Sequence, residues 1–105
     1  MDNITEKELL ELKNKGEKVL AQFTAAWCGP CRALAPVFES EIKPMFKGKV
    51  NFQEIDVDTN PDETIKYGVT SVPTVIIERD GALLERYTGA NSKYTYINAL
   101  NEHTK

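Results

Sequence analysis

The sequence predicts an α/β fold in a single domain, built on a mixed β-sheet flanked by helices. A chain of 105 residues with 41% hydrophobic and 28% charged residues has the size and composition of one globular domain. Short apolar runs alternate with segments of helical periodicity, which indicates parallel strands joined by crossover helices. Asp80-Gly81 separates the last two apolar runs and indicates an antiparallel hairpin.

The chain begins with a predicted helix and a buried strand. Thr5 and Glu8 match a capping box, so we expect a helix over about residues 6–15. Residues 18–24, KVLAQFT, form a short apolar run typical of a buried parallel strand.

A long helix and a second parallel strand follow. Apolar residues recur at helical spacing up to about residue 46, and Pro30 suits the first turn of this helix. Pro36 lies inside it and should kink it, because proline lacks an amide donor and clashes with the preceding turn. Residues 50–57, VNFQEIDV, are the next strand candidate.

The second half of the sequence predicts a short helix and the two strands of the hairpin. Asn60 can cap a helix that has Pro61 in its first position and ends before Gly68. Residues 74–77 are rich in β-branched side chains, and residues 83–88 form the second hairpin strand.

The chain closes with one more predicted helix. Gly89 ends the preceding strand, and Ser92 can cap a helix in which Tyr94, Ile97 and Leu100 share one face.

The charge pattern excludes some classes of partner. The net charge is -3, and Lys and Arg are not clustered along the sequence, so we expect no nucleic-acid binding. No run approaches the about 18 apolar residues that span a bilayer, so we expect no membrane insertion. The acidic N-terminus does not resemble a signal peptide, which favours the cytoplasm.

Both cysteines of the chain lie in the segment AAWCGPCRALAP, residues 25–36. A structural zinc site needs four ligands, and the only histidine, His103, is distant in sequence, so we expect no metal site. A disulfide across so short a loop would constrain little of the unfolded chain. Two simply buried thiols remain an alternative.

The position of the two cysteines in the predicted fold favours redox chemistry over inert, buried thiols. Cys28 falls where a predicted strand ends and a helix begins, and there free amides and the helix dipole stabilise a thiolate. Cys31 lies one turn further on, with less access to solvent expected. We therefore predict Cys28 as the nucleophile and Cys31 as the resolving thiol.

The motif Trp27-Cys28-Gly29-Pro30-Cys31 resembles the active site of the thioredoxin family. Further residues fall at spacings similar to those of that family: Pro36, Asp58, Asn60-Pro61, Tyr67-Gly68, Val72-Pro73-Thr74, Gly81 and Gly89. The resemblance implies a thioredoxin fold over residues 1–105, with a central mixed sheet of four to five strands flanked by helices. It also implies a cis peptide bond at Pro73, facing the cysteines. The substrate groove that it implies is formed by Trp27, Gly29, Pro30, Val72, Pro73, Gly89 and Ala90.

The activity implied by the resemblance is that of a protein-disulfide oxidoreductase that reduces disulfides in target proteins. The Cys28–Cys31 pair would cycle between dithiol and disulfide, with no bound cofactor. A flavoprotein, thioredoxin reductase, would return electrons from NADPH. We expect a monomer, because no long apolar edge demands a partner. The alternative is a non-enzymatic binding module that uses the fold as a docking partner.

The sequence departs from the family pattern at three positions. Gln22 replaces a buried aspartate, and Glu54 replaces a lysine on the neighbouring strand. Either these are tolerated polar residues, or Glu54 supplies the proton-transfer group that glutamine cannot provide. Thr24 stands where many relatives have a tryptophan, which should loosen the wall of the site. The family's first edge strand is expected to be reduced to residues 3–5 or absent.

Overall fold

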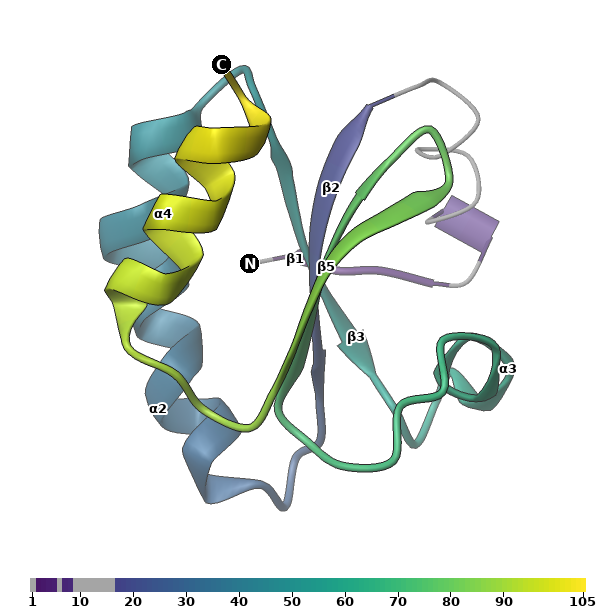
Figure 1. Cartoon of the computed structure of the whole chain (residues 1–105). Coiled ribbons are helices and arrows are strands. Elements are labelled where there is room, and N and C mark those ends of the chain that lie inside the picture. Colours follow the sequence, from purple (N-terminus) through teal and green to yellow (C-terminus); the bar gives the residue numbers. More distant parts are fainter. Residues whose placement is uncertain (1, 6, 9–16) are drawn as a thin grey trace.

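A five-stranded mixed sheet forms the centre of the computed structural model, which describes residues 2–5, 7–8 and 17–105 (Figure 1). The strand order is β1-β3-β2-β4-β5. β1 and β2 both pair with β3 in parallel, whereas β4 is antiparallel to β2 and β5 is antiparallel to β4. The strands are β1 Asp2–Asn3, β2 Lys18–Thr24, β3 Asn51–Asp56, β4 Thr74–Arg79 and β5 Ala82–Thr88. The predicted mixed α/β sheet is confirmed.

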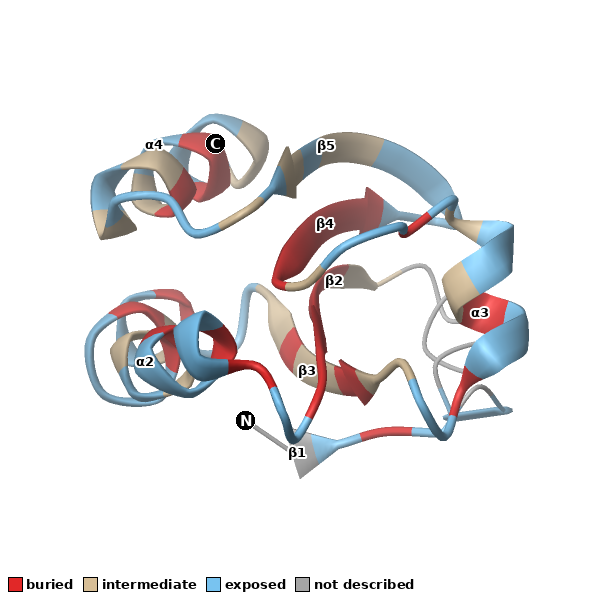
Figure 2. Cartoon of the chain, turned by 90° about the horizontal axis from the view of Figure 1, so that it is seen from below, coloured by how far each residue is buried: buried red, intermediate tan, exposed pale blue. Residues whose placement is uncertain are grey.

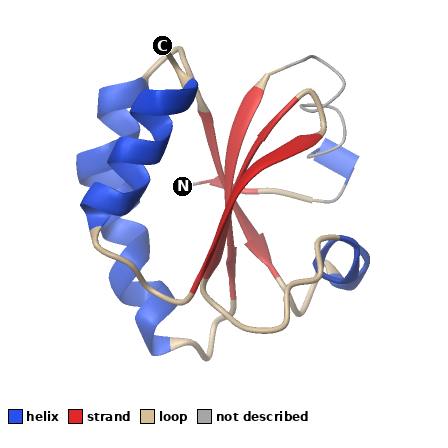
Figure 3. Ribbon diagram, in the orientation of Figure 1, coloured by secondary structure: helices blue, strands red, loops and turns tan. Residues whose placement is uncertain are grey.

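The helices cover the two faces of the sheet unequally (Figure 3). α2 (Gly29–Val37) and α4 (Lys93–His103) lie on one face, and α3 (Pro61–Lys66) lies on the other. Within the described residues, no helix is long and apolar enough to cross a membrane. Most of the predicted helix at 6–15 lies outside the described residues, but the Glu8 amide donates to Thr5 Oγ1 at 3.2 Å, as a capping box requires.

The helix after the cysteines changes its hydrogen-bond pattern along its length. α2 is followed by a π-helical segment, Phe38–Ile42, and a 3₁₀ segment, Lys43–Phe46. The sequence predicted that the helical segment ends at about residue 46, which is correct, but it did not predict the π-helical and 3₁₀ turns. Pro36 has no amide hydrogen to donate, so the regular ladder is interrupted and the following turn is free to widen.

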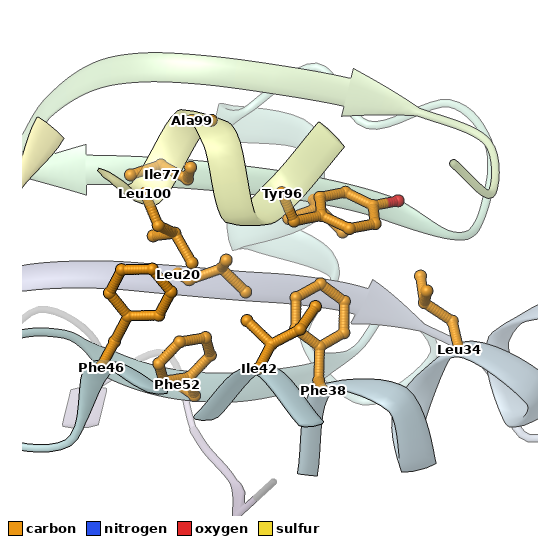
Figure 4. Packing of buried hydrophobic residues seen from close by; sticks show 11 residues of the cluster. Leu20, Leu34, Phe38, Ile42, Phe46, Phe52, Ile77, Tyr96, Ala99 and Leu100 are labelled. Atoms are coloured by element: carbon orange, nitrogen blue, oxygen red, sulfur yellow. The ribbon is translucent and has the colours of Figure 1, made fainter. Parts of the chain in front are cut away.

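The main core lies between the sheet and the layer of α2 and α4 (Figure 4). Phe38 is central to it, because its ring lies 4.9 Å from that of Tyr96 and 6.3 Å from that of Phe52, measured between centroids. A second cluster on the opposite face includes Val19 and Phe23 of β2. The central strands are therefore buried from both sides, as Figure 2 shows for β2 and β4.

Two local predictions in the second half of the chain are wrong. Asn60 occupies the position before α3, but its amide donates to the Asp56 carbonyl at 3.0 Å and makes no capping bond. In α4, Tyr96 and Leu100 are buried, whereas Tyr94 is exposed. The apolar face therefore starts two residues later than predicted.

Other expectations for the secondary structure hold. The Tyr94 amide donates to Ser92 Oγ at 3.3 Å, so Ser92 caps α4 as predicted. The first edge strand is present as β1, one residue earlier than expected, and the Ile4 amide extends its pairing by donating to the Glu54 carbonyl at 3.0 Å. The hairpin turns at Asp80 and Gly81, both with positive φ, as the sequence predicted.

Candidate active site

Cys28 stands between the end of β2 and the first turn of α2. Its amide donates to the Ala25 carbonyl at 3.1 Å, and its side chain caps the helix by accepting from the Cys31 amide at 3.2 Å. A sulfur in this position faces free amides and the positive end of the helix dipole. Both features stabilise a thiolate over a thiol, which makes the sulfur more nucleophilic at neutral pH.

The two cysteines form a disulfide, with 5.3 Å between their Cα atoms. Both are buried: 4% of Cys28 and 1% of Cys31 are exposed. Cys31 is less exposed than Cys28, as predicted, but the difference in exposure is small in this oxidised state. Ala25, Val57 and Val72 pack around the pair and shield it from solvent.

Pro73 is brought to the cysteine pair through its neighbour Val72. The Val72–Pro73 peptide bond is cis, as the family resemblance implied. The Gly89 amide donates to the Pro73 carbonyl at 2.8 Å, which holds the start of β4 against the end of β5. Val72 packs against the cysteine pair and is followed directly by Pro73, whose carbonyl Gly89 binds. Ala90, the next residue after Gly89, is exposed.

Trp27 is the most prominent surface feature next to the cysteines, with 69% of the residue exposed. Its Nε1 donates to Asp58 Oδ2 at 3.0 Å, which orients the indole across the site. The indole also borders a small cavity of about 130 Å³ between the end of β3 and the segment before β4. Gly29 and Pro30, the remaining groove candidates, are exposed beside it.

Asp58 is the site residue that sequence reasoning missed. It was part of the family spacing, but nothing in the sequence assigned it a contact. Its own amide donates to Asp56 Oδ1 at 2.8 Å, so the turn after β3 holds the carboxylate in place for Trp27. Only a tertiary contact between residues far apart in the chain reveals this function.

Gln22 and Glu54 lie side by side on β2 and β3. Gln22 is fully buried, and neither polar atom of its amide has a hydrogen-bond partner in the described part of the chain. Burial raises the pKa of the Glu54 carboxyl, and the nearby Asp56 carboxylate adds to that effect. Of the two neighbours, only Glu54 has a proton to gain or lose, so burial shifts the protonation equilibrium of Glu54 and leaves Gln22 neutral.

A cavity of about 200 Å³ is lined by Cys31 and by the carboxylic side chains of Glu54 and Asp56. It lies between α2 and the ends of β2 and β3, and Glu54 lines it while Gln22 does not. Its lining consists of Thr24, Ala25, Ala26, Cys31, Arg32, Ala35, Glu54 and Asp56. Thr24 belongs to this lining, and the loosening expected from its small side chain stays a prediction.

Comparison of the sequence with models of protein families assigns the chain to one family. The family model described as Thioredoxin matches residues 4–102. The chain belongs to the thioredoxin family. Thioredoxin from Staphylococcus aureus is 39% identical over 84 residues, which cover 80% of each chain.

Solved structures of the thioredoxin family have the same fold. The thioredoxin of Fasciola hepatica superposes with a TM-score of 0.86 at 34% identity, covering 97% of both chains. The thioredoxin of Trypanosoma brucei brucei gives a TM-score of 0.87 at 30% identity, covering 98% of this chain and 88% of the other. Together with the disulfide at the helix N-terminus, this makes the chain a protein-disulfide oxidoreductase.

Metal chemistry has no support in the described residues. They contain no group of three or more His, Cys, Asp or Glu side chains placed to hold a metal ion. The thioredoxin family uses the cysteine pair itself as the redox centre.

Proposed function

We propose that this member of the thioredoxin family reduces disulfides in other proteins. The observation that carries the proposal is the capping bond from the Cys31 amide to the Cys28 sulfur, 3.2 Å long, at the N-terminus of α2. It supports Cys28 as the nucleophile, because a helix N-terminus stabilises a sulfur in this position as an anion. The exposed Trp27 and the cis bond before Pro73 would guide an extended target segment to that sulfur.

The reaction would proceed in two exchanges. The Cys28 thiolate attacks one sulfur of the target disulfide; an intermolecular S–S bond forms and the other target sulfur leaves as a thiolate. Cys31 then loses its proton and attacks the Cys28 sulfur, which releases the second target thiolate. The target gains two electrons, and the Cys28–Cys31 pair ends as the disulfide seen in this structure.

The proton of Cys31 needs an acceptor, and we propose Glu54. Both residues line the same cavity of about 200 Å³, which is large enough for water to connect them. The Gln22 amide cannot accept a proton at neutral pH, and it does not line this cavity, so Glu54 is the better candidate of the two. Asp56 lines the cavity too and favours the protonated form of its neighbour.

The wider setting is proposed on the family relationship. Oxidised protein would be recharged by thioredoxin reductase with electrons from NADPH, in the cytoplasm, and residues 1–105 would act as one monomeric domain. The substrate groove would comprise Trp27, Gly29, Pro30, Val72, Pro73, Gly89 and Ala90.

An insulin turbidity assay with dithiothreitol, repeated with NADPH and thioredoxin reductase, tests the proposal. Wild type should reduce insulin in both formats, and Cys28→Ser should abolish activity. Cys31→Ser should accumulate a mixed disulfide with the target, because the second exchange is blocked. Ala33→Ser places a hydroxyl at an exposed position of the same helix and should retain full activity. Wild-type insulin reduction no faster than Cys28→Ser would contradict the proposal and favour a docking protein.

A further inference from the structure

A second cleft lies at the opposite end of β2 from the cysteines. Its volume is about 540 Å³, within the range of small-molecule sites in proteins. It is lined by Glu17, Lys18, Gly48, Lys49, Val50, Asn51 and Arg79, and we call it the basic cleft. Its residues come from the start of β2, the turn before β3, the start of β3 and the end of β4, elements that Figure 1 shows at one end of the sheet.

Among the described residues, three cations line the basic cleft against one carboxylate, although the net charge of the chain is -3. Lys18 and Arg79 are direct partners on the antiparallel strands β2 and β4, so two like charges project from the same face. Like charges in this arrangement repel each other and destabilise the strand pair. A bound anion would remove that repulsion.

The ammonium groups in the basic cleft are available to a ligand. Neither Lys18 nor Lys49 forms an ion pair with any residue in the described part of the chain. Arg79 donates from Nη2 to the carbonyl of His103 at 2.7 Å, which anchors the guanidinium at the end of α4 and leaves its other donors free. Among the described residues of the lining, Glu17 is the only acidic one.

The walls of the basic cleft are built from well-anchored backbone. Lys18 and Arg79 lie within strand pairs, and the turn that carries Lys49 is closed by two bonds to the Phe46 carbonyl, from the amides of Lys49 at 2.9 Å and Val50 at 3.2 Å. Gly48 adopts φ of 78° in this turn, which a side chain would strain. A preformed cleft loses little conformational entropy when a ligand enters.

The positive charge continues beyond the basic cleft. A neighbouring cavity of about 400 Å³ shares Gly48 and Val50 with it and is lined by Lys43 and Lys47. Lys43 is paired with Glu39 at 3.4 Å, so it contributes less than an unpaired lysine would. The cationic side chains thus come from β2, the 3₁₀ segment, the following turn and β4.

We propose that the basic cleft binds a small anion with several phosphate groups, such as the polyphosphate chain of a nucleotide. Several cations around a concave site suit a ligand that carries several negative charges at short spacing. Binding here is separate from the cysteine chemistry, because the seven residues of β2 lie between the two sites. The proposal therefore does not depend on disulfide reduction.

NMR titration of the oxidised full chain at low salt tests the proposal, with inorganic tripolyphosphate as the probe. Wild type should show saturable binding, with amide shifts concentrated in residues 17–18, 48–51 and 79. Lys49→Glu should weaken binding about tenfold or more, because it replaces a phosphate-facing cation with a carboxylate. Glu17→Gln should strengthen binding, because it removes the opposing charge.

Lys66→Glu is the matched control, since it changes the net charge equally but lies on α3, outside the basic cleft. Its affinity for tripolyphosphate should stay within about twofold of wild type, and both lysine variants should keep insulin reduction and their circular dichroism spectrum. Absence of saturable binding, or equal weakening in both variants, would overturn the proposal. ATP in place of tripolyphosphate then shows whether a nucleotide or free polyphosphate is the better ligand.

Discussion

At the scale of single residues, the proposed proton transfer from Cys31 depends on the difference between Gln22 and its strand neighbour Glu54. Gln22 is neutral at every relevant pH, so its burial costs only unmade hydrogen bonds. Glu54 is partly buried, and dehydration raises the pKa of its carboxyl above the usual 4.5. A carboxylate whose pKa is raised towards neutrality is a better proton acceptor than an ordinary surface glutamate.

The Glu54→Gln variant isolates this proton transfer. In wild type, the rate at which Cys31 resolves a mixed disulfide should rise as the pH passes upward through the raised pKa of Glu54, since only the carboxylate accepts a proton. In Glu54→Gln this rise should be missing and the rate at neutral pH lower. Stopped-flow Trp27 fluorescence between pH 4 and 9 measures both profiles.

The pH dependence of the free energy of unfolding is a second, independent test of the raised pKa of Glu54. Because folding raises the pKa of Glu54, its contribution to stability is full below about pH 4.5 and is lost as the pH rises through the raised value. Wild type should therefore lose stability relative to Glu54→Gln over that window. Glu102→Gln, an exposed change near the C-terminus, should alter neither profile. Identical resolution profiles for wild type and Glu54→Gln would remove Glu54 from the mechanism.

At the scale of elements, the β4–β5 hairpin shows how a turn sets the edge of the sheet. Asp80 and Gly81 have φ of 53° and 80°, the combination that a tight two-residue hairpin requires. The turn pairs Arg79 with Ala82, and a register shift between Ile77 and Glu78 then brings Thr74 opposite Thr88. Turn and shift together help to hold Gly89 against Pro73. The pairing of β4 with β5 therefore positions Pro73 and Gly89, which lie at the end of the hairpin opposite the turn.

Gly81→Ala should lower the free energy of unfolding by about 1–2 kcal/mol, since an L-residue is strained at positive φ. No neighbouring atom obstructs the added methyl group, so the cost is purely conformational. Gly29→Ala is the matched control: its methyl group also meets open space, but its backbone is helical, so it should be neutral or stabilising. Urea unfolding measures both, and equal effects would contradict the assignment to backbone strain.

At the scale of the whole molecule, one aromatic cluster joins the helical layer to the sheet. Phe38 comes from the π-helical segment, Tyr96 from α4 and Phe52 from β3, and all three are buried (Figure 4). The irregular turn after Pro36 determines how Phe38 enters this cluster. The helix that carries the cysteines is therefore anchored to the same core that supports the sheet.

Phe38→Ala should destabilise the protein by about 3–5 kcal/mol, because it removes a fully buried ring and leaves a cavity. Tyr94→Ala, on the exposed side of α4, should cost less than about 0.5 kcal/mol. Thermal unfolding monitored by circular dichroism compares the two. A small effect of Phe38→Ala would show that the helical layer contributes little to the core.

Regular patterns in the sequence predicted most elements, and the departures have local causes. Residues 18–24 were assigned as a strand with the observed bounds, because a short apolar run between helices has few other interpretations. Tyr94 was placed on one apolar face with Ile97 and Leu100, but Tyr96 is the buried aromatic, since helical spacing alone allows either ring to face inward. Asn60 precedes α3 as expected, but its side-chain Nδ2 donates to the Asp56 carbonyl and its side chain makes no capping bond to α3.

The sequence by itself determined the chemistry of this protein, because two cysteines three positions apart at a strand-to-helix junction interact locally. The tertiary structure alone decided what surrounds them: the contact of Asp58 with Trp27 and the cavity that Glu54 shares with Cys31. It also gathered cations that are dispersed along the chain into the basic cleft. Charges act through distance in space, and folding sets those distances between residues far apart in sequence.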